Sequence, residues 1–212
     1  MRIFPMWTSG LAEPRRSRED RPATRNIEFG VAHEPAQNPL SRHRLPVREV
    51  TVLPIQPVDR RALEQIAAEL RSRGVKVQLK PSILRPRDCY DAHRGQFKAD
   101  VLLERVELAA ERPVIGITDA DCYAGALNFV FGIADLGGGT AVVSLARLRA
   151  RASPSTFAAR ALKEICHELG HAVGLRHCEN PCCVMCFSNS LAEADAKGEE
   201  LCASCMRRLR AA

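Results

Sequence analysis

The feature that most constrains the fold is the segment HELGHAVGLRH, which runs from His167 to His177. His167 and His171 are four residues apart, so a helix stacks both imidazoles on one face, where they can reach a single ion. Gly174 lets the backbone leave that helix sharply, at a positive φ. His177 can then turn back toward the other two. The segment therefore predicts a helix that ends at Gly174 with a metal ion beside its last turn.

These residue types suit a catalytic zinc ion. Neutral imidazole is a zinc ligand, and three protein ligands leave the fourth tetrahedral position free for water. The metal lowers the pKa of that water toward ~7 and polarises a substrate carbonyl. Glu168 follows the first ligand, so it lies beside the metal and can act as the general base. We expect a zinc metallopeptidase; the alternative is three ordinary surface or core histidines on a helix.

The chain has nine cysteines, six of them after His177. The sequence contains no run of about 18 apolar residues, so it predicts no membrane span. The N-terminus lacks the apolar core of a signal peptide. We therefore expect a cytoplasmic protein, in which cysteines favour metal binding over disulfides. Cys178 and Cys183 followed by Cys202 and Cys205 form a C-x4-C and a C-x2-C pair, which predicts a closed, structural zinc site.

Other cysteines leave alternatives open. Cys182 and Cys186 could replace a ligand of the structural site. The cluster could also hold unpaired buried cysteines or a reactive redox pair. Cys89, Cys122 and Cys166 are expected to be small core residues.

The net charge of +6 is a weak argument for a nucleic-acid partner. Residues 1–46 contribute +3 of it, with eight arginines against five acidic residues. The remainder is of mixed sign and has only short basic groups. We therefore expect no nucleic-acid partner, no membrane partner, and a monomer that acts on a peptide or protein.

Apolar periodicity predicts an α/β (α+β) fold with a twisted mixed sheet. Residues 1–46 lack periodicity and are expected to be a disordered extension. The expected strands are 50–55, 75–79, 114–118, 127–133 and 140–145. The expected helices are 60–73, 92–110 and 154–173, the first capped by Asp59 and the last by Ser153. Little regular structure is expected after Gly174, where a metal would replace a core.

The two ligand groups together resemble the archaemetzincins, a family of metzincin-like metallopeptidases with the pattern HExxHxxGxxHC, x4-C-x-M and C-x-x-C. Residues 167–178, 183–185 and 202–205 match it. Upstream, CYDAHRGQFKADVLL (89–103), TDADCYAGALNFVFG (118–132) and VVSLARL (142–148) are also similar, so the resemblance covers residues 47–210. The spacer after Met185 is one residue shorter than usual, and Cys186 stands where relatives carry a small serine-like residue.

The resemblance implies a metzincin-like zincin domain in two parts with a cleft between them. Residues 47–174 would form the N-terminal subdomain with the active-site helix, and 175–210 a small Cys-rich, zinc-stabilised C-terminal subdomain. Met185 would lie in the Met-turn beneath the catalytic zinc. An edge strand would pair with extended substrate. Its residues would be Asn128, Phe129, Val130, Phe131 and Gly132.

The activity so implied is that of an aminopeptidase or an endopeptidase of small peptides, with two zinc ions per chain. One alternative is a catalytically silent zinc-binding scaffold that acts through protein partners. Another is a cysteine-rich redox or nucleic-acid module, whose function would survive loss of His171.

Overall fold

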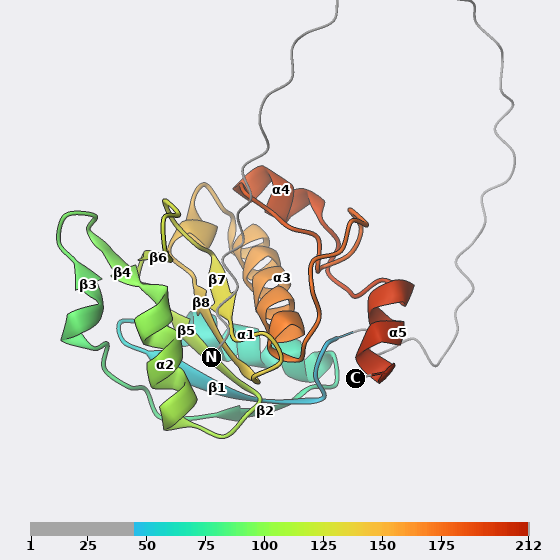
Figure 1. The fold of residues 1–212 in the computed structure, drawn as a ribbon, viewed down its shortest axis with the longest axis horizontal. Coiled ribbons are helices and arrows are strands. Elements are labelled where there is room, and N and C mark those ends of the chain that lie inside the picture. Colours follow the sequence, from blue (N-terminus) through green and yellow to red (C-terminus); the bar gives the residue numbers. More distant parts are fainter. Residues whose placement is uncertain (1–44, 212) are drawn as a thin grey trace, which may run out of the picture.

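The structure, a computed structural model, describes residues 45–211. Apart from Leu45 and Pro46, which are buried, the expected N-terminal extension lies outside the described residues. A five-stranded sheet with the order β2-β1-β5-β8-β7 forms the centre of the fold (Figure 1). Its strands in chain order are β1 (Glu49–Ile55), β2 (Lys76–Leu79), β5 (Val114–Thr118), β7 (Gly132–Ala134) and β8 (Thr140–Ser144).

Four of these strands are parallel, and β7 pairs antiparallel with β8 at the edge. The sheet is therefore mixed, as predicted. Every residue of β5 and β8 is buried. Helices cover both faces of these strands, which explains why their sequences are nearly continuous apolar runs rather than alternating ones.

Helices α1 (Arg60–Ser72) and α3 (Pro154–Ala172) pack on one face of the sheet, and α2 (Ala99–Ala109) packs on the other (Figure 1). Two apolar cores result. The side chains of Ile115 and Ile117 join the core under α1 and α3, while that of Val114 joins the core under α2. The predicted caps are confirmed: Asp59 accepts from the N–H of Arg61, and Ser153 accepts from that of Thr156. Cys89, Cys122 and Cys166 are buried, as predicted.

The predicted helix 92–110 begins too early. Its first residues include strand β4 (Gln96–Lys98), which joins β3 (Tyr90–Asp91) and β6 (Cys122–Tyr123) in a small second sheet. The Asp91 carboxylate accepts from the N–H groups of His93 and Arg94, and Gly95 takes a φ of +65°. This side-chain-stabilised turn competes with the helix and delays it to Ala99.

The predicted strand 127–133 is also too long, because only Gly132–Ala134 pairs with β8. Ahead of it, side chains take the backbone carbonyls: Arg94 donates to the Leu127 oxygen and Gln96 to the Asn128 oxygen. Val130 makes an isolated bridge to Cys122. The segment 127–131 therefore lies beside the sheet edge without being a regular strand.

The expectation of little regular structure after Gly174 is wrong. Helices α4 (Leu191–Ala196) and α5 (Ala203–Ala211) lie there. Earlier in the chain, short 3-10 turns occupy Arg87–Cys89 and Arg147–Arg149. The N-cap Ser190 of α4 accepts from the N–H of Glu193, a pattern readable in the sequence. Each helix buries only one residue fully, so its apolar pattern is weak in the sequence. Among the described helices, none is long and apolar enough to cross a membrane.

Candidate metal centres

Three histidines converge at the C-terminal end of α3. His167 and His171 project from consecutive turns of this helix, and their ring centroids are 4.6 Å apart. His177 approaches from the loop after the helix. One ring nitrogen from each of the three lies within 4.8 Å of the others. The structure thus brings together the three histidines that the sequence singled out.

Hydrogen bonds fix which nitrogens face one another. The Nδ1 of His167 lies 2.8 Å from the Val184 carbonyl, and the Nδ1 of His171 lies 2.7 Å from the Leu175 carbonyl. Since a carbonyl only accepts, each Nδ1 carries the proton and each Nε2 a lone pair. The two Nε2 atoms are nevertheless 3.0 Å apart.

Two facing lone pairs repel each other unless a cation lies between them. The Nε2 of His177 is buried and has no hydrogen-bond partner within residues 45–211. Zn–N bonds of ~2.0–2.1 Å in a tetrahedron separate ligand nitrogens by about 3.4 Å, close to the observed spacing. The three imidazoles therefore fit a zinc ion.

Burial keeps these histidines neutral. It lowers the pKa of His167 well below its usual value, and the charges of Lys197 and His171 lower it further. Burial likewise lowers the pKa of His171, and that of His177 to about 4. At neutral pH all three imidazoles are in the form that binds a metal.

The end of α3 is capped by the turn between β7 and β8. The N–H groups of Gly137 and Gly139 donate to the carbonyls of His171 and Ala172. Gly174 adopts a φ of +94°, as its position in the motif predicts. Nothing in the sequence around Gly137 and Gly139 indicates this contact with the metal-binding helix, because it depends on tertiary packing.

Met185 packs directly beneath the helix. It is fully buried, and a Cβ on Gly170 would overlap its Sδ atom. The glycine within the motif is therefore required by this close approach of the Met185 loop. The same loop supplies the Val184 carbonyl that holds His167.

Glu168 is buried beside the histidines. A Cβ on Gly132 would overlap its side chain, so the edge strand β7 passes directly over this carboxyl group. Burial raises the pKa of Glu168 well above its usual value, and the nearby Glu164 carboxylate raises it further, while Lys197 opposes them. Lys197 and Glu164 are themselves buried, with 3.5 Å between Nζ and Oε2.

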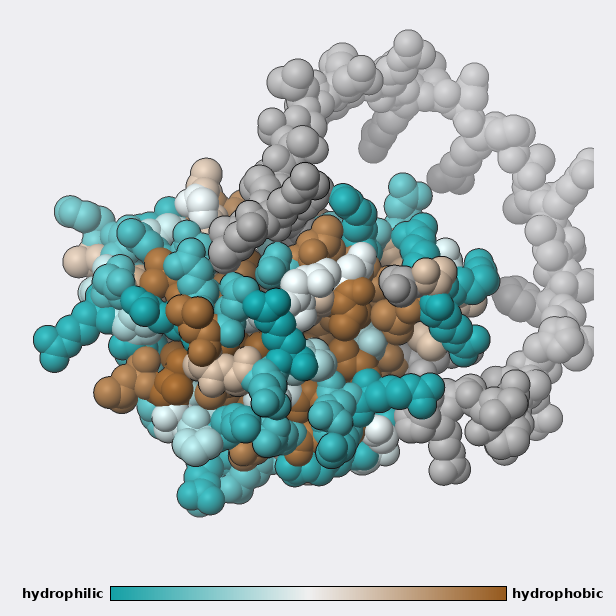
Figure 2. Space-filling view, turned by 60° about the horizontal axis from the view of Figure 1, so that its bottom comes forward, coloured by the Kyte–Doolittle hydropathy of each residue, from teal (hydrophilic) through white to brown (hydrophobic). Residues whose placement is uncertain are grey.

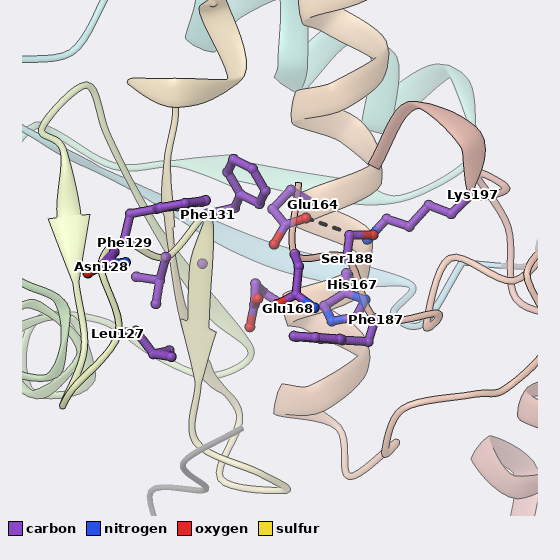
Figure 3. Close-up of a pocket in the computed structure, with 13 residues that line it drawn as sticks. Leu127, Asn128, Phe129, Phe131, Glu164, His167, Glu168, Phe187, Ser188 and Lys197 are labelled. Atoms are coloured by element: carbon purple, nitrogen blue, oxygen red, sulfur yellow. Dashed lines mark ion pairs between the residues drawn. The ribbon is translucent and has the colours of Figure 1, made fainter. Parts of the chain in front are cut away.

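A cavity of about 430 Å³ opens onto His167 and Glu168 (Figure 3). The segment 127–132 lines one part of it, including all five residues of the expected substrate-binding edge. Helix α3 contributes a second part, and the segment 187–189 with Lys197 a third. Only Gly132 of the expected edge belongs to a strand, yet the whole segment faces this cavity.

The four predicted cysteines form a second centre. The Sγ atoms of Cys178 and Cys202 are 3.7 Å apart, and those of Cys183 and Cys205 are 3.8 Å apart. Zn–S bonds of ~2.3 Å in a tetrahedron place sulfur atoms about 3.8 Å apart. All four Sγ atoms lie within 4.8 Å of one another. The donor set and its spacing therefore fit a closed zinc site.

Neither of the surplus cysteines, Cys182 and Cys186, belongs to this four-sulfur group. The pKa of Cys202 is lowered to about 6, first by the backbone N–H of Cys205. Burial raises the pKa of Cys183 and of Cys205.

Comparison with known proteins places the chain in a family. The model of peptidase family M54 matches residues 87–211. The archaemetzincin of Methanocaldococcus jannaschii is 37% identical over 169 residues, which cover 77% of this chain and 94% of that protein. The archaemetzincin of Pyrococcus furiosus is 37% identical over 175 residues, 76% of this chain and 91% of that protein.

Two solved structures share the fold. The crystal structure of archaemetzincin from Methanopyrus kandleri has a TM-score of 0.70 at 34% identity and covers 81% of this chain and 96% of its own. That from Archaeoglobus fulgidus, complexed with malonate, has a TM-score of 0.68 at 34% identity, covering 76% of this chain and 99% of its own. The chain therefore belongs to peptidase family M54, the archaemetzincins, which are zinc metallopeptidases.

Proposed function

We propose that this chain hydrolyses peptide bonds at a zinc ion bound by His167, His171 and His177, with Glu168 as the general base. A second zinc ion, on Cys178, Cys183, Cys202 and Cys205, has a structural role. The observation that carries the proposal is the pair of Nε2 lone pairs facing each other at 3.0 Å beside the orphaned Nε2 of His177.

Zinc, when bound, polarises the carbonyl of the scissile bond and acidifies the attacking water. Glu168 receives the proton of that water and delivers it to the leaving amine. Its buried position and raised pKa support this role, because a general base works best when its pKa approaches the working pH. Gly132 leaves the space in which the carboxyl group lies.

The substrate backbone pairs antiparallel with the segment 128–132. Within the described part of the chain, neither the N–H nor the C=O of Phe129 has a hydrogen-bond partner. Leu127 and Asn128 differ, since Arg94 and Gln96 already occupy their carbonyls. This arrangement supports a short pairing centred on Phe129.

The cavity of about 430 Å³ is the size of a small-ligand pocket, which favours short peptides as substrates of an aminopeptidase or a small-peptide endopeptidase. Its lining also supports the two-part organisation, 47–174 and 175–210. Residues 127–132 and α3 come from the first part, and 187–189 with Lys197 from the second. The cleft therefore lies between the proposed subdomains.

The test is digestion of a diverse peptide library by the zinc-loaded wild type and by Glu168→Gln, with products read by mass spectrometry. We expect cleavage by the wild type and a loss of about 10²–10⁴-fold in rate in the variant, at unchanged zinc content. Cut sites distinguish trimming of N-termini from internal cleavage. Equal cleavage by both proteins would remove Glu168 from the mechanism.

A further inference from the structure

The cavity beside the metal centre contains two polar side chains that the proposed chemistry does not use. Ser188 and Lys197 both line it, on the wall that the C-terminal part contributes (Figure 3). The Ser188 Oγ is buried and has no hydrogen-bond partner within residues 45–211. Lys197 is 4% exposed. Buried polar groups are normally paired, so each requires an explanation.

Glu164 satisfies the Lys197 ammonium only in part. Their separation of 3.5 Å exceeds the ~2.7–2.9 Å of a charge-assisted hydrogen bond. No hydrogen bond from the Lys197 Nζ to another residue of the described chain is formed. An ammonium carries three donors, and here they border a cavity. A hydroxyl and an ammonium on one wall form a donor set for an anionic oxygen ligand.

The fold holds Lys197 firmly in this place. It follows directly after α4, and α4 is tied to α3 by partly buried contacts. Arg160 forms two hydrogen bonds of 2.6 Å with the Asp195 carboxylate, and Lys163 donates to the Asp195 carbonyl at 2.8 Å. The donor set is therefore preorganised, which lowers the entropic cost of binding a ligand.

The position of Lys197 relative to the metal centre limits which residue of a substrate can carry the group that Lys197 binds. Glu164, the partner of Lys197, is one helical turn before Glu168, and a turn of α-helix rises about 5.4 Å. One extended residue spans about 3.5 Å. A group held by Lys197 therefore belongs to a residue adjoining the scissile bond rather than to a distant part of the peptide.

We propose that Lys197 and Ser188 bind a carboxylate of the substrate next to the scissile bond, so that the enzyme selects peptides carrying one there. The carboxylate is either an Asp or Glu side chain or the C-terminus of a short peptide. Glu164 and Glu168 oppose this anion, whereas the ammonium and the two charges of a zinc ion favour it. This selectivity rests on the proposed peptidase function.

The test measures binding separately from cleavage. Zinc-loaded Glu168→Gln protein is titrated calorimetrically with two peptide pairs. Ala-Glu-Ala-Ala-amide, with a free N-terminus that an aminopeptidase can also accept, is compared with its Gln counterpart, which tests the side chain. Ala-Ala with a free C-terminus is compared with its amide, which tests the C-terminus. We expect the carboxylate member of one pair to bind about tenfold or more tightly, the range of one charged hydrogen bond.

Variants assign the effect to its residues. In the Glu168→Gln background, Lys197→Met and Ser188→Ala should each reduce the preference to about twofold or less. Ser188→Ala removes only an unpaired hydroxyl, so it should fold normally even if Lys197→Met does not. Lys76→Met, at an exposed lysine on β2, is the control that should keep the full preference. A preference that survives both substitutions, as direct binding to zinc would give, overturns the proposal, as does equal binding of both members in both pairs.

The same peptides given to the wild type separate this proposal from the peptidase function. Cleavage without a carboxylate preference would contradict only the role of Lys197 and Ser188. A carboxylate preference in binding without any cleavage would contradict only the peptidase function.

Discussion

The histidine centre and the cysteine centre differ in what surrounds them. The histidine centre offers three ligands, two of them on a largely buried helix, beside a cavity. The cysteine centre offers four sulfurs from two loops and from the start of α5, and none of these residues lines that cavity. Three ligands beside a cavity suit catalysis, and four ligands enclosing an ion suit structure.

The two centres also differ in what forms them. The apolar core positions α3, so the fold itself brings the histidines together. The helices within residues 175–211 each bury only one residue fully, so an ion bound by the four cysteines would add to the stability of this part. The centres are nevertheless connected: His177 adjoins Cys178, and the Val184 carbonyl that holds His167 adjoins Cys183. Loss of the cysteine centre should therefore disrupt the histidine centre, whereas loss of the histidine centre should leave the cysteine centre intact.

The largest effect that tests this asymmetry is expected from Cys205→Ser. Loss of one sulfur should release the structural zinc and destabilise the fold by more than about 4 kcal/mol, the range seen when a structural metal is lost. Because the displaced loop also holds His167, zinc content should fall below one ion per chain. Thermal unfolding and elemental analysis measure both effects. The exposed Cys182→Ser, outside the four-sulfur group, should retain both ions. A Cys205→Ser protein that keeps one ion would show the centres to be independent.

A smaller effect is expected where the two regions touch beneath α3. Gly170→Ala introduces a Cβ that overlaps Met185. We expect a loss of about 1–3 kcal/mol from overpacking, reduced by the higher helix propensity of alanine. Denaturant unfolding measures it. In a Met185→Ala background, where the overlapping side chain is removed, Gly170→Ala should lower the free energy of unfolding by less than it does alone. A stabilising Gly170→Ala would contradict the close packing.

A third effect, on zinc affinity rather than on the stability of the fold, is a difference in how pH affects the two centres. Because the pKa values of the three histidines are lowered, they hold fewer protons than free imidazoles do, so zinc displaces few protons from them. Cys183 and Cys205, with raised pKa values, retain their protons at neutral pH and must release them. Affinity of the cysteine centre should therefore rise by at least about two log units per pH unit, and that of the histidine centre much less. Chelator competition at pH 6, 7 and 8 measures the slopes; equal slopes would contradict this difference.

The sequence predicted best those features that depend on local spacing. The α3 helix, its Ser153 cap, the positive φ of Gly174 and strand β5 follow from patterns within a few residues. The convergence of His177 with the other histidines was also foreseen from spacing.

Features set by distant contacts were missed. The late start of β7 within the predicted strand 127–133 depends on Arg94 and Gln96, about thirty residues earlier. The capping of α3 by Gly137 and Gly139 depends on tertiary packing. Lys197 and Ser188 carry no motif, and only the folded chain shows that they border the cavity beside Glu168. By contrast, the Ser190–Glu193 cap of α4 was a local signal that could have been recognised.

The most direct test of the two-centre account is the zinc content of the purified wild type and of His171→Ala, measured by elemental analysis together with thermal unfolding. We expect two ions in the wild type and one in the variant, with the remaining ion lost only when the fold unfolds. A wild type that binds one ion or none, or a His171→Ala protein that still binds two, would contradict it.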